Sequence, residues 1–185
     1  MDPTPNRLIT RDQVALLVID VQERLLPAIH EGERVVTNIV KLLRFADIID
    51  LPVLLTEQQK LGETVEPIRA EIPSIPPIRK LDFGCFRCGE FVEAVRALGR
   101  TTLVLTGIEA HICVAQTALQ ALGEHVVHVV SDAVSSRSAL DKQVALDRLG
   151  RAGAIVTSTE MLMYELLGCA GTDEFRRVLV LVKGS

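Results

Sequence analysis

Short apolar runs alternate along this chain with longer segments of helical period, and this alternation constrains the fold more than any other feature. Strands are predicted for five runs rich in Val, Leu and Ile: residues 14–19, 53–55, 102–105, 126–130 and 154–156. Helical periodicity predicts helices over residues 35–49, 91–98, 113–122, 140–152, 159–167 and 172–182. Strands separated by helices of this length form parallel sheets with right-handed crossovers. The sequence therefore predicts an α/β fold, a doubly wound three-layer α/β/α sandwich around a mainly parallel sheet.

The composition suits such a sheet and argues against several classes of protein. Apolar residues make up 48% of the 185 residues and aromatic residues only 3%, so the core is aliphatic, as in a sheet buried on both faces. The net charge of −4 argues against nucleic acid as the main partner. No apolar run reaches the roughly 18 residues of a membrane helix, and the N-terminal residues do not predict a secretory signal. We expect one domain over residues 1–185, a cytoplasmic location and reduced cysteines.

Polar residues stand where four of the predicted strands end. Asp20 follows the first strand, Thr56-Glu57-Gln58 the second, Thr106-Gly107 the third and Ser131-Asp132 the fourth. Ligands of parallel α/β sheets bind beyond the carboxyl ends of the strands, so we expect these four ends to lie near one another. A charge at Asp20, directly after an apolar run, requires a partner.

Cys113 lies six residues after Gly107, where a segment of helical period begins. A helix N-terminus favours the thiolate, which makes Cys113 a candidate nucleophile; the alternative is a buried cysteine that serves as a small apolar residue. A thiol nucleophile needs a base and donors for the oxyanion. Asp20 can serve as the base, and Lys80 can keep Asp20 charged while lowering the pKa of the thiol. The tight segment 107–113 can supply backbone N–H groups as an oxyanion hole.

Three segments together resemble the isochorismatase-like cysteine hydrolases, over residues 15–163. They are Leu-Leu-Val-Ile-Asp-Val-Gln at residues 16–22, Lys80 before a central helix, and Val-Leu-Thr-Gly-Ile-Glu-Ala-His-Ile-Cys-Val at residues 104–114. The resemblance implies the family's fold and its thiol chemistry.

Residue by residue, the resemblance implies a catalytic triad of Asp20, Lys80 and Cys113. Cys113 would attack a carbonyl to give a thioester that water hydrolyses, while Asp20 would carry the thiol proton to the leaving amine and Lys80 would stabilise the charged pair. The resemblance also implies a cis peptide bond between Ile108 and Glu109, which would aim the N–H groups of Glu109 and Cys113 at the oxyanion.

Five further residues are expected to contact the substrate. The resemblance places Gln22 in the pocket. Glu57, at a strand's carboxyl end, is either a pocket acid or a helix-start carboxylate. Phe83 and Phe86, with the cysteine between them, are expected to shape a loop over the pocket. His111 is too close in sequence to the thiol to face it in a tight turn, so we expect it in the pocket wall.

Two departures from relatives narrow the expected chemistry. Nicotinamidases carry an Asp-x-His metal site after the second strand, where this chain has Thr56-Glu57-Gln58-Gln59, so we expect no metal and no other cofactor. Isochorismatases lack the cysteine and cleave a vinyl ether, so Cys113 favours hydrolysis of a small amide or related C–N bond. The Thr-Glu-Gln sequence resembles the isochorismatase-domain-containing subgroup.

Two other functions compete with this one. The chain can be a catalytically weak scaffold that works as an oligomeric binding protein. Cys85 and Cys88 form a C-x-x-C pair of the kind that binds zinc or does disulfide chemistry, but a second pair is lacking. The apolar segment 172–182 favours self-association. We expect a homo-oligomer that acts on a small molecule, with neither nucleic acid nor a membrane as partner.

Overall fold

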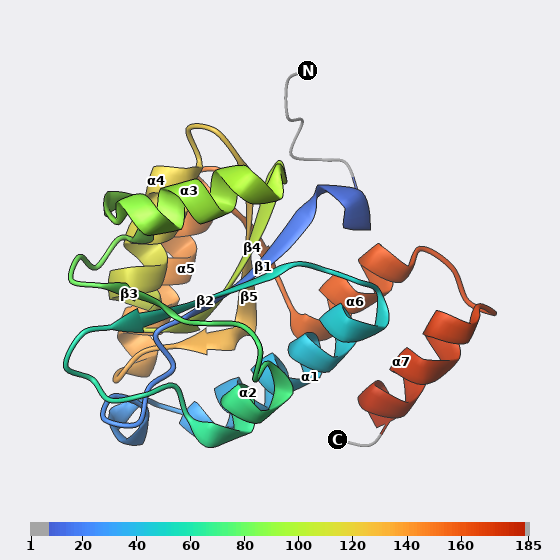
Figure 1. Ribbon diagram of the computed structural model, residues 1–185, viewed down its shortest axis with the longest axis horizontal. Coiled ribbons are helices and arrows are strands. Elements are labelled where there is room, and N and C mark those ends of the chain that lie inside the picture. Colours follow the sequence, from blue (N-terminus) through green and yellow to red (C-terminus); the bar gives the residue numbers. More distant parts are fainter. Residues whose placement is uncertain (1–7, 184–185) are drawn as a thin grey trace.

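The computed structural model describes residues 8–183 and has the predicted α/β fold. Its six strands are all parallel and stand in the order β3-β2-β1-β4-β5-β6 (Figure 1). The strands are β1 (Val14–Ile19), β2 (Val53–Gln58), β3 (Ile78–Lys80), β4 (Thr102–Ile108), β5 (Val126–Ser135) and β6 (Ile155–Thr157).

Helices cover both faces of the sheet (Figure 1). One face carries α1 (Gly32–Ile48), α2 (Glu66–Glu71), α6 (Thr159–Leu167) and α7 (Asp173–Lys183). The other carries α3 (Gly89–Leu98), α4 (Ala115–Ala121) and α5 (Ala139–Arg151). Short helical turns complete the fold: η1 (Arg11–Gln13), η2 (Leu26–Ala28), η3 (Cys85–Arg87) and the π-helical η4 (Ala110–Val114).

The central strand β1 shows why the sheet is apolar on both faces. All six of its residues are buried. Leu16 and Val18 point into the cluster under α1, whereas Leu17 and Ile19 point into the cluster under α3, α4 and α5. The sequence of a strand covered on both faces is a continuous apolar run, because neither face of the strand is exposed to water.

The fold class and all five predicted strands are confirmed, and two short elements were missed. β3 lies at the end of the proline-rich stretch for which the sequence predicts only an extended path. α2 has a single fully buried residue, Ile68. A strand or helix of three to six residues is too short to show a periodic pattern of apolar residues, so it cannot be predicted from its own sequence.

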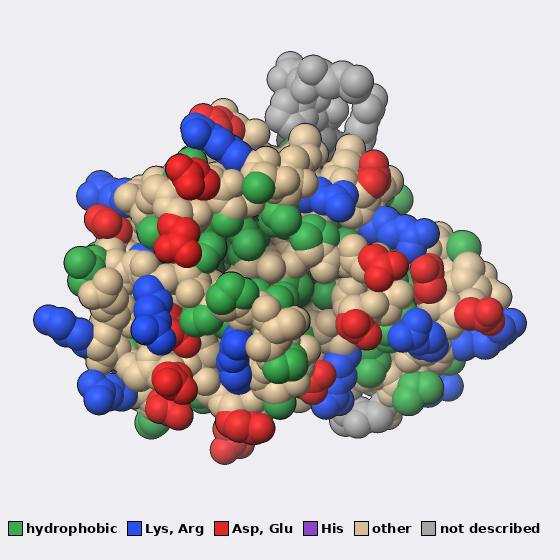
Figure 2. Space-filling view, viewed as in Figure 1, with side chains coloured by type: hydrophobic (Ala, Val, Ile, Leu, Met, Phe, Trp, Pro, Cys, Tyr) green, Lys and Arg blue, Asp and Glu red, His purple; other side chains and the backbone are tan. Residues whose placement is uncertain are grey.

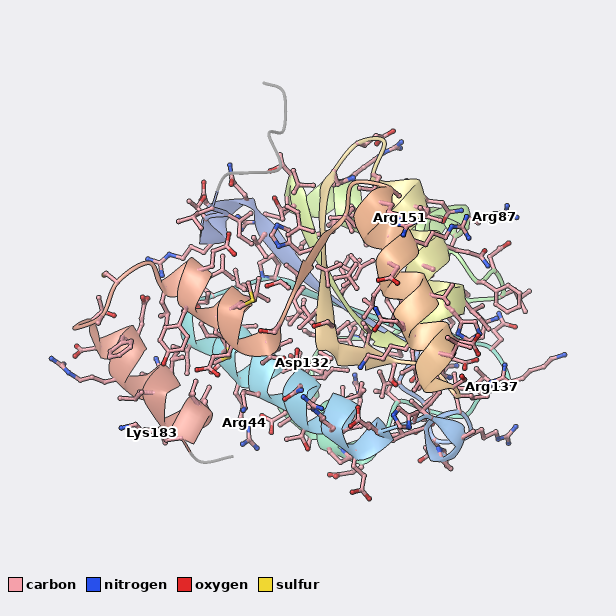
Figure 3. The ribbon with its side chains drawn as sticks, turned by 180° about the vertical axis from the view of Figure 1, so that it is seen from behind. Arg44, Arg87, Asp132, Arg137, Arg151 and Lys183 are labelled. Carbon is pink, nitrogen blue, oxygen red and sulfur yellow. The ribbon has the colours of Figure 1, made fainter. Side chains whose placement is uncertain are left out.

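The prediction that Ser131 and Asp132 end the fourth strand, next to the other strand ends, is wrong. β5 continues to Ser135, and its register against β4 shifts between Leu105 and Gly107, so Asp132 lies in an irregular stretch of the strand. Its Oδ1 accepts the N–H and the hydroxyl of Thr159, at 2.8 and 3.0 Å, and so caps α6. Figure 3 shows Asp132 on this side of the molecule, between α1 and α6.

None of the helices within residues 8–183 combines the length and the apolar character needed to span a lipid bilayer.

Candidate active site

The candidate active site lies where the strand order reverses, at the carboxyl ends of β1, β2 and β4. Asp20 follows β1 with φ at +54°, a left-handed conformation that Asp tolerates better than most residues. Gly107 in the neighbouring strand has φ at +111°, and a Cβ there would lie 2.0 Å from the carbonyl oxygen of Ile19. Glycine is therefore required for β4 to pass so close to the end of β1.

Two neighbours bind the buried carboxylate of Asp20. The ammonium of Lys80, from β3, lies 2.5 Å from Oδ2, and the hydroxyl of Thr56, from β2, donates to Oδ1 over 2.7 Å. The backbone N–H of Asp20 donates to the carbonyl of Thr56. A carboxylate removed from water needs such donors in order to stay ionised.

Lys80 has a partner for each of its three ammonium protons. Besides Asp20, it donates to Gln58 Oε1 at 2.9 Å and to the carbonyl of Asp82 at 3.2 Å. Burial is the largest single influence and would lower the pKa of Lys80, but the charge and hydrogen bond of Asp20, together with the nearby Cys113 and Cys85, raise it overall. Lys80 is therefore a fixed cation rather than a proton carrier.

Cys113 lies in the π-helical turn η4, just before α4, and is 6% exposed. Its thiol lies close enough to Asp20 and Lys80 for both charges to shift its pKa. Burial, followed by the charge of Asp20, raises the pKa of Cys113, and the opposing effect of Lys80 is smaller. Burial beside a carboxylate thus acts against the thiolate that a helix start favours. The resting thiol is neutral and can donate to Asp20.

The segment between β4 and the thiol contains a cis peptide bond, between Ile108 and Glu109. Oε2 of Glu109 accepts the backbone N–H and the Nε–H of Arg137, both at 3.0 Å. Figure 3 shows Arg137 beside the start of α5. The side chain of Glu109 is thus engaged in structure, which leaves its backbone as the part that can serve the site.

Gln22 and Glu57 hold the loop after β2. The Gln22 amide donates to the carbonyls of Gln58 and Gly62 at 3.0 and 2.7 Å and accepts the N–H of Gln58 at 2.8 Å. Glu57 Oε1 accepts the N–H and hydroxyl of Thr64, both at 2.9 Å. Both side chains are almost fully buried and bound by protein groups, and Glu57 also lines a hollow of about 490 Å³ with Gln58 and Arg79.

The aromatic and histidine candidates occupy three different environments. Phe83 is 53% exposed on the loop after Lys80. Phe86 packs edge-on against Phe91, with ring centroids 5.2 Å apart, and lines a separate hollow of about 270 Å³. His111 Nδ1 lies 2.9 Å from the hydroxyl of Ser136, on the same turn as Cys113. Phe83 and His111 thus remain candidates for the pocket wall, and Phe86 does not.

Sequence reasoning missed three polar partners around the triad. Thr56 and Gln58 were noted at a strand end but given no role, although they bind Asp20 and Lys80. The hydroxyl of Thr117 donates to the carbonyl of Cys113 over 2.7 Å. Thr117 lies four residues after Cys113 in a predicted helix, where a threonine hydroxyl can donate to the carbonyl four residues earlier. This contact could therefore have been predicted from the spacing.

The four cysteines are free, and within residues 8–183 no group of three His, Cys, Asp or Glu side chains is placed to hold a metal ion. Cys85, expected in a loop over the pocket, is instead fully buried, whereas Cys88 is half-buried.

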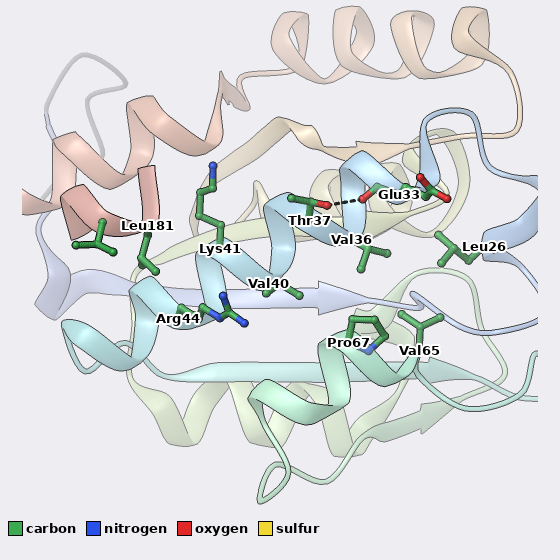
Figure 4. Close-up of a pocket in the computed structure, with 11 residues that line it drawn as sticks. Leu26, Glu33, Val36, Thr37, Val40, Lys41, Arg44, Val65, Pro67 and Leu181 are labelled. Atoms are coloured by element: carbon green, nitrogen blue, oxygen red, sulfur yellow. Dashed lines mark hydrogen bonds between the residues drawn. The ribbon is translucent and has the colours of Figure 1, made fainter. Parts of the chain in front are cut away.

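A larger apolar cavity lies elsewhere. It has a volume of about 680 Å³ and lies beside α1, between α2 and α7 (Figure 4). Its lining includes Val36, Val40, Val65 and Leu181 but none of the triad. Because none of the triad residues lines this cavity, it is separate from the candidate active site.

Comparison with known proteins identifies the family. The family profile of the isochorismatase domain matches residues 14–161. The chain belongs to the isochorismatase family. Isochorismatase domain-containing protein 2 of Danio rerio is 37% identical over 177 residues, which cover 93% of this chain and 87% of that protein. This places the chain in the isochorismatase domain-containing subgroup, as the sequence predicts.

Two solved structures are similar over nearly the whole chain. One is described as the MAR1 ribonuclease of Caenorhabditis elegans; it has a TM-score of 0.90 and 32% identity, and the match covers 96% of this chain and 93% of that one. The other is the YcaC gene product of Escherichia coli, described as an octameric hydrolase of unknown specificity. It has a TM-score of 0.87 and 26% identity, with 98% and 90% coverage. The chain therefore has an isochorismatase-like hydrolase fold whose relatives include oligomers.

Proposed function

We propose that the protein is a metal-independent cysteine hydrolase that cleaves a small amide or related C–N bond. One observation carries this proposal: buried Asp20 is held by Lys80 and Thr56, and the buried thiol of Cys113 lies close enough for the Asp20 charge to raise its pKa. A neutral thiol beside a fixed carboxylate is a nucleophile paired with its own base.

In the first half of the reaction the proton of Cys113 moves to Asp20 as sulfur attacks the carbonyl carbon. The carbonyl π electrons move to oxygen, and the backbone N–H groups of Glu109 and Cys113 stabilise the oxyanion. Asp20 then gives its proton to the leaving nitrogen, the C–N bond breaks, and a thioester remains on Cys113.

In the second half, water attacks the thioester while Asp20 accepts one of its protons. Collapse of the tetrahedral intermediate breaks the C–S bond, releases the carboxylic acid product, and returns the proton from Asp20 to the sulfur. Lys80 keeps its proton throughout and stabilises the carboxylate form of Asp20 at each turnover.

The substrate is proposed to be small and not a nucleic acid, although one similar structure is described as a ribonuclease. Cys113 is almost fully buried, which suits a compact ligand better than a polymer. Acidic and basic side chains are interspersed on the face shown in Figure 2, around a central group of apolar side chains. The net charge of −4 also disfavours phosphate backbones.

Turnover of a panel of small amides by the purified protein tests the proposal, with Cys113→Ser as the control. Turnover by the native protein and not by the variant supports it. Absence of turnover across the panel would favour the alternative, a catalytically weak scaffold that acts as a binding protein.

We also propose a homo-oligomer of single-domain subunits in the cytoplasm. The octameric relative supports self-association, as does α7, where Val178 is buried but Val180 is 70% exposed. Four free cysteines suit a reducing compartment. Light scattering of the purified protein measures the subunit number.

A further inference from the structure

The apolar cavity beside α1 has a second apolar row of that helix as its floor. The side of α1 that faces the sheet is buried through Val35, Ile39 and Leu42. On the opposite side, Val36 and Val40 are half-buried and line the cavity. A helix that covers a sheet needs only one apolar face, so this second row indicates a contact other than the core.

Three other elements complete the walls of the cavity. They supply Leu26 from η2, Val65 and Pro67 from the start of α2, and Val180 and Leu181 from α7. The volume of about 680 Å³ lies within the range of pockets that bind small molecules. Among the valines and leucines of the lining only Val180 is strongly exposed, so the apolar surface lies inside a hollow. This shape favours a small ligand over the broad face of a second protein copy.

The charges around the cavity favour an anionic group near α7. Figure 4 shows Lys41 and Arg44 at the α7 end of the cavity, and Leu26 and Val65 at the opposite end. Arg44 is already paired, because its Nε and Nη2 donate to Glu71 Oε1 at 2.9 and 2.6 Å. In the part of the chain that the structure describes, no hydrogen bond or ion pair engages the ammonium of Lys41. Lys41 is therefore the charge that a ligand can neutralise.

The one acidic residue of the lining, Glu33, lies away from Lys41. It belongs to the first turn of α1, where the helix dipole already favours a negative charge. Eight residues separate it from Lys41, which corresponds to about 12 Å along the helix axis. A negative group beside Lys41 thus avoids repulsion by Glu33, and the distance between them leaves room for an aliphatic chain.

We propose that this cavity binds an aliphatic carboxylate of medium chain length. Its carboxylate pairs with Lys41, and its tail lies along Val40 and Val36 toward Leu26. None of the triad residues lines the cavity, so this binding site is additional to the proposed hydrolase site. Because α7 forms one wall but has a single fully buried residue, Val178, an occupied cavity also stabilises the docking of α7.

Calorimetric titration of the purified protein with hexanoate, octanoate and decanoate tests the proposal. Burial of the tail predicts that each added pair of methylene groups lowers the Kd by about tenfold. Decan-1-ol has the same tail without the charge, and decylammonium has the opposite charge. Decanoate should bind more tightly than either of them.

Substitutions at the two ends of the interaction separate charge recognition from tail burial. Lys41→Gln should raise the Kd of decanoate by about three- to tenfold and leave the Kd of decan-1-ol unchanged, whereas Lys41→Arg should keep the affinity for decanoate. Lys60→Gln, at an exposed lysine after β2, is the matched control and should change neither Kd.

Val40→Glu places a negative charge in the floor of the cavity and should weaken decanoate binding by about tenfold or more. Val144→Glu, at an exposed valine of α5, is its control and should leave the Kd unchanged. If Val40→Glu does not fold, Val180→Glu gives the same comparison from the exposed wall on α7.

The inference would be overturned if decanoate failed to bind, if decylammonium bound as tightly as decanoate, or if Val40→Glu left the Kd unchanged. A lower subunit number of Val40→Glu in light scattering would also overturn it, since a second copy would then occupy the cavity. None of these results bears on the proposed hydrolase, because every substitution lies outside the triad.

Discussion

The ammonium nitrogen of Lys80 lies 2.5 Å from Oδ2 of Asp20, and both side chains are completely buried. Neither charge is solvated by water, so each is stabilised by the other. This pair joins β3, an edge strand of three residues, to the end of the central strand β1. The ion pair thus ties the edge of the sheet to its centre.

Lys80→Met should lower the free energy of unfolding by about 3 to 5 kcal/mol, because it leaves the Asp20 carboxylate buried without its counterion. Urea unfolding measures this effect. Lys183→Met, at an exposed lysine of α7, is the matched control and should change stability by less than about 0.5 kcal/mol. Equal effects of the two variants would show that the buried pair contributes nothing specific.

Asp20→Asn should lower the pKa of Cys113 while abolishing turnover. Burial contributes most to the raised pKa of Cys113 and the charge of Asp20 contributes next, whereas Lys80 lowers this pKa. Removing the carboxylate charge leaves burial and Lys80 in place, so the pKa of Cys113 falls and the thiolate forms at a lower pH. The ultraviolet absorbance of the thiolate follows the change, with Cys113→Ser as the blank. A higher pKa in the variant would contradict the electrostatic assignment.

Gly107→Ala should destabilise the protein by more than about 2 kcal/mol, since the new Cβ would lie 2.0 Å from the Ile19 carbonyl oxygen on a backbone with positive φ. Gly99→Ala is the control, because Gly99 also has positive φ but has no atom within 4 Å of its added Cβ. Its cost should be about 1 kcal/mol. Thermal unfolding of the two variants separates the destabilisation caused by the close contact from the destabilisation caused by the positive φ.

His128 should make the protein less stable in mild acid. The side chain is 2% exposed, and within residues 8–183 neither ring nitrogen has a hydrogen-bond partner. Burial lowers the pKa of His128, although Glu165 opposes this. Below about pH 6.5 the unfolded chain binds a proton that the folded protein resists, so the free energy of unfolding falls with pH.

Urea midpoints at about pH 5.5 and 7.5 measure the effect. His128→Leu should show a smaller acid loss than the native protein, and the exposed His30→Gln should match the native protein. An equal acid loss in the native protein and His128→Leu would rule out His128 as the source.

Much of this architecture follows from the sequence. The carboxyl ends of parallel strands share one edge, which is why Asp20 and Thr56 meet although they are separated by a helix. The position of Gly107, six residues before the thiol, can also be interpreted from the sequence. A glycine inside a strand often marks a place where another part of the backbone comes close.

What the sequence did not predict depends on local distances. The bulge in β5 turns Asp132 toward α6, and nothing in the pattern of apolar residues marks that shift. The raised pKa of Cys113 arises from burial beside Asp20, which sequence spacing does not measure. The hydrogen bond from the backbone N–H of Cys85 to the hydroxyl of Thr117 also joins two segments that no sequence pattern links.

The most direct test of the central claim is to acylate the protein with p-nitrophenyl acetate and to locate the acetyl group by peptide mass spectrometry over time. The exposed thiol of Cys169 is the internal control. The account predicts an acetyl group that appears on Cys113 before Cys169 and is then lost to water, and that does not turn over in Asp20→Asn. Acetylation of Cys169 ahead of Cys113, or an acetyl group on Cys113 that is lost equally fast without Asp20, would contradict it.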